Sequence, residues 1–233
     1  MLLGLFFALL VAIFWSLGEI SYSRLVRNVD RANVYLYQYL TRSVLYLLVA
    51  LIFNASLFGS FSFDHFFVFL PIIACDLFAS YVVNIAVANG KLSVVSPIMA
   101  AYPIIDIFLG LIIFKESIGV VEILLSIVIA SSIVMLASRQ KKTKNAPHPL
   151  KGVIFSLCYM LLVAFSICFE KSAYIGDFSV YELYFYKGIV YIAIYIHLRQ
   201  IYDFKPIHIT SCCWIKCIII LIINIINTII INI

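Results

Sequence analysis

The sequence predicts an all-α integral membrane protein with about eight transmembrane helices, and three observations support this prediction. First, 65% of the 233 residues are hydrophobic and 12% are charged, whereas a soluble domain has about 25% charged residues. Second, apolar stretches recur along the chain, each near the ~20 residues that a membrane-crossing helix needs. Third, a basic linker over residues 139–151, RQKKTKNAPHPLK, divides these stretches into two groups.

The expected helices follow in order, beginning with residues 2–22. No basic segment precedes this stretch and no small-residue cleavage motif ends it, which favours a retained helix over a cleaved signal peptide. Turns of only a few residues join the third, fourth and fifth spans, so these helices are expected to be antiparallel neighbours. The other spans are expected at about 34–53, 66–89, 93–114, 118–138, 152–171, 180–198 and 212–233.

The fourth span carries polar and helix-breaking residues at membrane depth, in the stretch GKLSVVSPIMAAYPIIDIFLGLIIFKE. Pro97 and Pro103 each remove a backbone donor and clash with the carbonyl four residues earlier, so two interruptions are expected. In lipid, a broken helix is tolerated only against protein or a wet cavity. We therefore expect this helix to line a cavity. The alternative is a kink without a functional role, because proline is common in membrane helices.

The same region resembles that of EamA-type permeases of the drug/metabolite transporter superfamily, and the resemblance covers residues 1–138 well and 150–198 weakly. It implies ten helices in two inverted five-helix halves around a central site, and it places Glu116 in the turn before the fifth helix. It also implies a permease for a small solute. The positions that carry the resemblance are Trp15, Ser16, Arg42, Gly90, Ser96, Pro97, Pro103, Lys115 and Glu116.

The part of the chain after the linker partly repeats the part before it. A constant offset pairs Tyr39, Arg42 and Tyr46 with Tyr184, Lys187 and Tyr191. A repeat with an odd number of spans inserts upside down relative to its partner. We therefore predict a five-helix first half over 1–138 and a partial, truncated inverted repeat over 152–233. Residues 199–233 form an atypical low-complexity tail, and a genuine terminal helix in a variant of the fold is the alternative for it.

The distribution of basic residues predicts the orientation in the membrane. Cytoplasmic loops carry an excess of Lys and Arg, so the richer side is expected to face the cytoplasm and the N-terminus to face outward. Family members usually have the opposite orientation, with the N-terminus inside. The richer side holds Arg24, Arg27, Arg31, Lys91, Arg139, Lys141, Lys142, Lys144, Lys151, Arg199 and Lys205, against Lys115 and Lys171 on the other.

Two carboxylates lie near the middle of predicted spans, Asp76 and Asp106. A central aspartate costs about 2.5–3.5 kcal/mol on insertion scales, so each should face the interior and have a partner. Arg42 is the nearest candidate partner, with Lys187 as its counterpart. The hypothesis is a substrate or proton site, and a buried ion pair that fixes helix packing is the alternative. The substrate-pathway candidates are Arg42, Asp76, Pro97, Pro103, Asp106 and Lys187.

The function predicted from these features is alternating-access transport of a small organic metabolite or drug-like solute across the plasma or inner membrane. Motifs of membrane metalloproteases, serine hydrolases and phosphate-binding loops are absent from the sequence, so no enzyme, cofactor or metal is expected. The basic residues lie in short loops, which argues against nucleic acid as a partner. The expected partners are the lipid bilayer, an unidentified small molecule and a second copy of the chain. The alternative is a non-transporting remnant or a partner-dependent membrane subunit.

Overall fold

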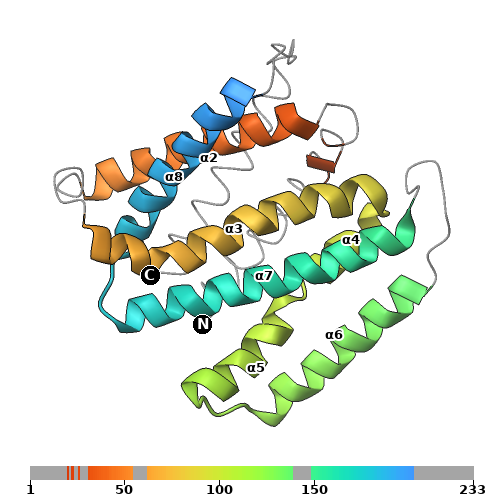
Figure 1. The fold of residues 1–233 in the computed structure, drawn as a ribbon. Coiled ribbons are helices and arrows are strands. Elements are labelled where there is room, and N and C mark those ends of the chain that lie inside the picture. Colours follow the sequence, from red (N-terminus) through yellow and green to blue (C-terminus); the bar gives the residue numbers. More distant parts are fainter. Residues whose placement is uncertain are drawn as a thin grey trace. The chain divides into compact units, whose positions relative to one another are not determined.

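The structure is a computed structural model that describes residues 31–54, 62–138 and 148–201, together with positions 20, 22, 23 and 26. The predicted span over 212–233 lies outside these described residues, as does the span over 2–22 apart from positions 20 and 22. Every element of regular secondary structure among these described residues is a helix, and helix numbering begins at α2 as in Figure 1. The helices are α2 (Arg31–Phe53), α3 (Phe63–Asn89), α4 (Leu92–Met99), α5 (Tyr102–Phe114), α6 (Val120–Ser138), α7 (Pro149–Ile175) and α8 (Val180–Ile201).

Four segments of the described chain are long and apolar enough to cross a membrane: Asn33–Phe53, Phe63–Asn89, Leu92–Phe114 and Pro149–Ile175. The fold is therefore that of an all-α membrane protein. The spans expected over 118–138 and 180–198 are also helical, as α6 and α8. However, the strongly apolar part of α6 is short, and α8 carries Glu182, Lys187 and Arg199. A total of eight membrane helices stays a prediction.

The chain divides into two compact units, one formed by residues 57–186 and the other by residues 1–56 together with 187–233. The chain passes between the units twice. One passage lies between residues 56 and 57, and the other lies inside α8, between Tyr186 and Lys187. These units cut across the two repeat halves that the sequence predicts, and the division at the basic linker stays a prediction.

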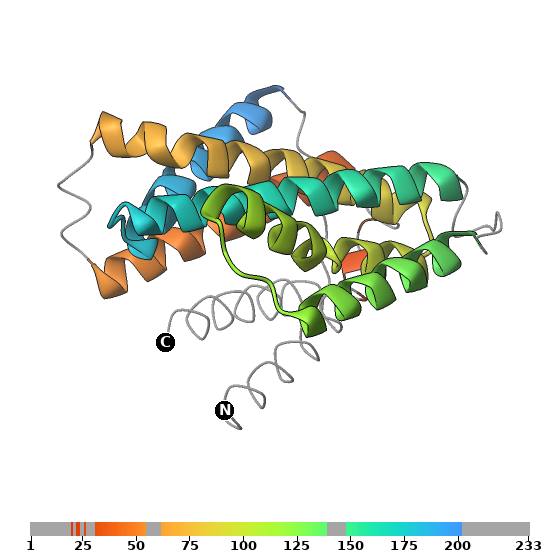
Figure 2. The same cartoon turned by 90° about the horizontal axis from the view of Figure 1, so that it is seen from below.

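In the unit of residues 57–186, α7 runs alongside α3 in the opposite direction, and α5 lies on the other flank of α7 (Figures 1 and 2). The backbones of this antiparallel pair approach closely at two glycines. A Cβ atom added to Gly152 in α7 would lie 2.5 Å from the Cα atom of Gly90, the residue that ends α3. Only glycine allows this approach, because any Cβ atom at residue 152 would overlap the backbone of its neighbour.

The fourth predicted span is broken once, at Ala100–Ala101, between α4 and α5. The break is closed by short backbone bonds: Ala101 N–H donates to the Ile98 carbonyl at 3.2 Å. Pro103 lies in the first turn of α5, where its missing N–H group needs no partner. Pro97 lies inside α4, so the expectation of a second interruption is wrong. The single break thus places Pro103 in a first turn, whereas α4 continues past Pro97.

The other unit contains α2 and the part of α8 from Lys187 onward. The ring of Tyr191 on α8 lies 5.6 Å from that of Tyr39 and 5.9 Å from that of Tyr46, centroid to centroid. A Cβ atom on Gly188 would lie 2.6 Å from Leu47, so the two helices approach closely there as well. The two segments matched by the sequence offset are therefore in contact at Tyr191.

Candidate functional site

Asp76, in the middle of α3, is held by a hydrogen bond from the neighbouring helix. The Ser166 hydroxyl on α7 donates to Asp76 Oδ1 at 2.9 Å. The Ser80 hydroxyl, one turn further along α3, donates to the backbone carbonyl of Asp76 at 2.8 Å. Asp76 therefore has a polar contact inside the helix pair, as a carboxylate at membrane depth requires.

Asp106, on α5, is in a different situation. Its Oδ1 atom is buried and has no hydrogen-bond partner among the described residues. It lies on α5 one turn beyond Pro103, and α5 packs against α7. Tyr102 and Cys168 are near enough to interact with Asp106 electrostatically. Asp106 is thus a half-buried carboxylate with unused acceptor capacity beside the helix break.

Helix α7 separates these two carboxylates. Ser166 contacts α3, whereas Cys168, two residues later, interacts with Asp106 on α5. Two residues correspond to a rotation of about 200° around a helix axis, so the two side chains leave α7 on opposite flanks. Helix α7 therefore donates a hydrogen bond to Asp76 on one flank and packs against α5, the helix of Asp106, on the other.

The remaining substrate-pathway candidates are distributed over both units. Pro97 and Pro103 lie on either side of the helix break, and both are exposed. Arg42 is half-buried on α2, and Lys187 is buried on α8. These two basic residues belong to the unit that does not contain the two aspartates, so a pairing between Arg42 and Asp106 stays a prediction.

The turn after α5 is anchored on the far end of α7. Lys115 ends the helix in the left-handed conformation, with φ 56°, and Glu116 N–H donates to the Gly110 carbonyl at 3.2 Å. A residue in this left-handed conformation commonly ends a helix, and here the N–H groups of Lys115 and Glu116 both donate to the Gly110 carbonyl. The Glu116 carboxylate forms an ion pair with Lys171, whose ammonium group also lies 4.8 Å from the ring centroid of Phe114. The residue expected in the family-like turn is therefore an anchor between α5 and α7.

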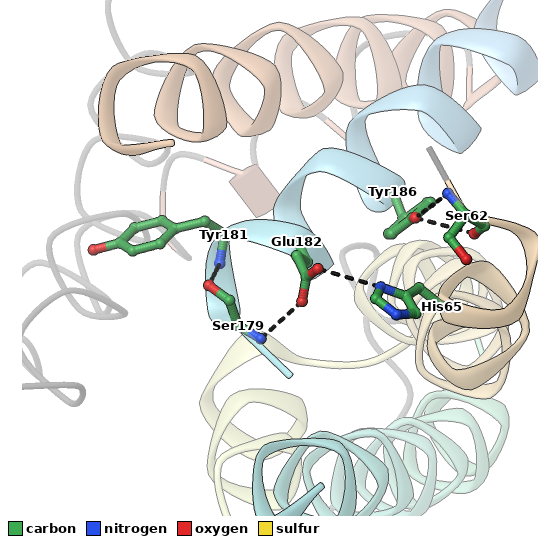
Figure 3. Close-up of polar contacts among 6 residues, drawn as sticks. All are labelled: Ser62, His65, Ser179, Tyr181, Glu182 and Tyr186. Carbon is green, nitrogen blue, oxygen red and sulfur yellow. Dashed lines mark hydrogen bonds and ion pairs between the residues drawn. The ribbon is translucent and has the colours of Figure 1, made fainter. Parts of the chain in front are cut away.

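A second set of polar contacts was not expected from the sequence, and it joins the start of α3 to the start of α8 (Figure 3). The Tyr186 hydroxyl donates to the Ser62 carbonyl and accepts from the Ser62 N–H group, each at 3.1 Å. Glu182 Oε1 lies 3.3 Å from His65 Nδ1. We call these contacts of Ser62, His65, Glu182 and Tyr186 the α3–α8 clasp. The pattern Ser179-x-x-Glu182, typical of a capping box, was the available sequence signal for part of it.

Comparison with known families decides the class of protein. The sequence profile of the EamA-like transporter family matches residues 2–138, which is more than half of the chain. The chain belongs to the EamA-like transporter family. No curated protein and no solved structure matches it. The match confirms the resemblance drawn from the prolines and Glu116, and it indicates a membrane transporter rather than an enzyme.

The matched region of this EamA-like protein ends before α7. It includes Asp76 and Glu116, whereas Ser166, which donates to Asp76, and Lys171, which pairs with Glu116, lie on α7. The described packing around the candidate site therefore depends on a helix beyond the matched region.

Proposed function

We propose that the protein is a multi-pass permease that moves a small organic metabolite or drug-like solute by alternating access. Membership of the EamA-like transporter family supports transport. The single observation that favours a particular site is the buried, unpartnered Oδ1 atom of Asp106 next to the break between α4 and α5. The surrounding membrane is the plasma or inner membrane.

An ionisable side chain at membrane depth is expensive, and it is kept there mainly for function. Asp76 is tied to Ser166, so it is suited to a structural role in the α3–α7 pair. The Oδ1 atom of Asp106 accepts no hydrogen bond from the described residues, so it can take up a proton or accept a hydrogen bond from a solute. Of the two aspartates, Asp106 is therefore the one that we assign to the transport pathway.

The broken helix provides further polar groups at the same depth. Because Pro103 has no N–H group, it cannot donate to the carbonyl of Met99 as a helical residue would. In transporters, interrupted helices typically supply such backbone groups to substrates and coupling ions near the middle of the membrane. Met99 and Asp106 thus contribute acceptors on the two sides of the break.

The experiment that tests this proposal measures transport together with folding. Proteoliposomes containing the full chain are incubated with a mixture of amino acids, nucleosides and small amines, and mass spectrometry measures which solutes enter. We expect Asp106→Asn to lower the flux at least about tenfold, by removal of a charge from the transport pathway, without a change in the detergent melting temperature. Asp64→Asn is the matched control, because Asp64 is exposed in the first turn of α3.

Three other results would contradict the proposal. Equal flux in Asp106→Asn and Asp64→Asn would remove Asp106 from the pathway. A lower melting temperature in Asp106→Asn, partly restored by Arg42→Gln, would indicate a packing ion pair. No flux of any tested solute through the wild-type protein would favour the non-transporting alternative.

A further inference from the structure

Tyr186 is fixed at the start of α8 by bonds to the backbone of another helix. Its hydroxyl uses both of its hydrogen-bonding roles on one residue, donating to the Ser62 carbonyl and accepting from the Ser62 N–H group. The side chain is 2% exposed. Its ring lies 6.0 Å from that of Phe66 and 5.6 Å from that of Phe69, centroid to centroid. The rotation of α8 about its own axis is therefore restrained at Tyr186.

Glu182, one turn before Tyr186, adds a second restraint on the same face of α8. Its Oε2 atom accepts from Ser179 N–H at 3.0 Å, which closes the capping box at the helix start. Its Oε1 atom reaches His65 on α3 at 3.3 Å. The ring of His65 in turn lies 5.0 Å from that of Phe178, in an edge-on arrangement. Two successive turns of α8 are thus attached to the first turn of α3, as Figure 3 illustrates.

These restraints act at a particular place in the chain. Tyr186 is the last residue of one compact unit, and Lys187 is the first residue of the other, inside one continuous helix. Lys187 is a charged residue that is 4% exposed, and it is the counterpart of Arg42 in the sequence repeat. Neighbouring residues of a helix are about 100° apart around its axis, so fixing the direction of residue 186 also fixes that of residue 187.

We propose that Tyr186 and Glu182 are positioning residues for Lys187: the α3–α8 clasp sets the rotation of α8 and thereby keeps the side chain of Lys187, a pathway candidate from the sequence, buried. The part of this inference that concerns transport rests on the proposed function. The part that concerns the burial of the side chain at residue 187 is independent of that function. The two can therefore be tested separately.

The test measures the accessibility of residue 187 in the full chain. The six native cysteines are replaced by alanine, Lys187→Cys provides a reporter thiol, and N-ethylmaleimide labels the protein in proteoliposomes. Tyr186→Phe removes both bonds to Ser62 and keeps the ring. We expect the loss of these two bonds, partly replaced by bonds to water, to raise the labelling rate about tenfold.

Ser62→Ala is the matched control, because the bonds from Tyr186 go to the Ser62 backbone and survive this substitution. We expect its labelling rate to equal that of the reporter protein. A labelling rate in Tyr186→Phe no higher than that of the reporter protein would overturn the proposal. A rise of the same size in Ser62→Ala would overturn it too, because it would point to general loosening of the helix start.

A second variant keeps the proposal testable if Tyr186→Phe fails to fold. Glu182→Gln weakens the contact with His65 and retains an oxygen that can accept from Ser179 N–H. We expect a smaller rise in labelling, about threefold, and His65→Gln should give a similar one. No rise in either variant would contradict the positioning role. Solute flux through Tyr186→Phe, measured with the native cysteines present, then reports on the transport part alone.

Discussion

Ser166 on α7 donates a 2.9 Å hydrogen bond to the carboxylate of Asp76 on α3, and this bond ties the two helices together near their middle. The carboxylate is thereby satisfied by a neutral hydroxyl group. Asp106 has no such bond on its buried oxygen among the described residues, although it lies on the other flank of the same helix. This difference in hydrogen bonding suits Asp76 to a role in helix packing and Asp106 to a role in binding.

Ser166→Ala should destabilise the protein in detergent by about 0.5–2 kcal/mol, because hydrogen bonds between membrane helices average about 0.6 kcal/mol and the buried carboxylate loses its donor. The measurement is the melting temperature of the purified protein. Ser132→Ala is the control, since the Ser132 hydroxyl is exposed on α6 and donates to its own helix, at the Val128 carbonyl. Equal changes in both variants would contradict a specific role for the Asp76 contact.

Gly152→Ala should be strongly destabilising, because the added methyl group would lie 2.5 Å from the Gly90 Cα atom. Overpacking of this kind costs about 1–3 kcal/mol when the backbone has to shift. Gly176→Ala is the control, because there the new Cβ atom would approach its neighbours no closer than 3.3 Å. A Gly152→Ala variant that melts at the same temperature as Gly176→Ala would mean that α3 and α7 do not touch at these glycines.

Lys115→Gly should stabilise the protein by about 1 kcal/mol, because Lys115 adopts the left-handed conformation that costs a non-glycine residue about 1–2 kcal/mol. Lys115→Ala removes the same charge but keeps the Cβ atom, so we expect no gain from it. Thermal melting of the three proteins isolates the backbone effect as the difference between glycine and alanine. If alanine stabilised as much as glycine did, the effect would belong to the lost charge.

The ion pair between Glu116 and Lys171 should contribute little to stability, since the two side chains are 49% and 42% exposed. Exposed pairs contribute about 0–1 kcal/mol and are weakened further by salt. Glu116→Gln should therefore lower the melting temperature by a few degrees at most, and by less in 1 M salt, where the Debye length is about 3 Å instead of about 10 Å at 0.1 M. A large loss that persists in high salt would indicate that the turn depends on Glu116 in another way.

The basic residues predict that the linker over 139–151 faces the cytoplasm. A cytoplasmic reporter fused after Lys144 should be active, and a reporter that requires export should be active when fused near Asn54. A Lys144 fusion that reports the outer side would establish the opposite orientation, which is the usual one in the family.

Local sequence patterns predicted the elements that depend on neighbouring residues. The spans over 34–53, 66–89 and 152–171 correspond to α2, α3 and α7, because each is a long apolar run with clear ends. The helix break was placed in the right span, since proline acts on its own backbone. The second break expected at Pro97 was wrong, because α4 continues past Pro97 to Met99. The one break that forms, at Ala100–Ala101, places Pro103 in the first turn of α5.

Contacts between distant segments could not be predicted in the same way. Nothing near Asp76 in the sequence indicates that a serine on α7 is its donor, and Tyr186 reaches the backbone of Ser62 from more than half the chain length away. Such partners depend on the register of packed helices, which apolar periodicity leaves undetermined. The capping box at Ser179 and Glu182 is the exception, because it is a local motif.

The two contacts between α3 and α7 leave these helices with a single register. Asp76 and Gly90 are about four turns apart on one helix, as are Ser166 and Gly152 on the other, so both contacts form at one setting. A slide of one turn, about 5.4 Å, would bring Leu162 or Glu170 opposite Asp76 in place of the hydroxyl group. The same slide would take Gly152 away from Gly90. Helices that slide past each other need more than one register in which their side chains pack, and α3 and α7 have one such register. We therefore expect these two helices to move together as a rigid pair while other helices shift relative to them.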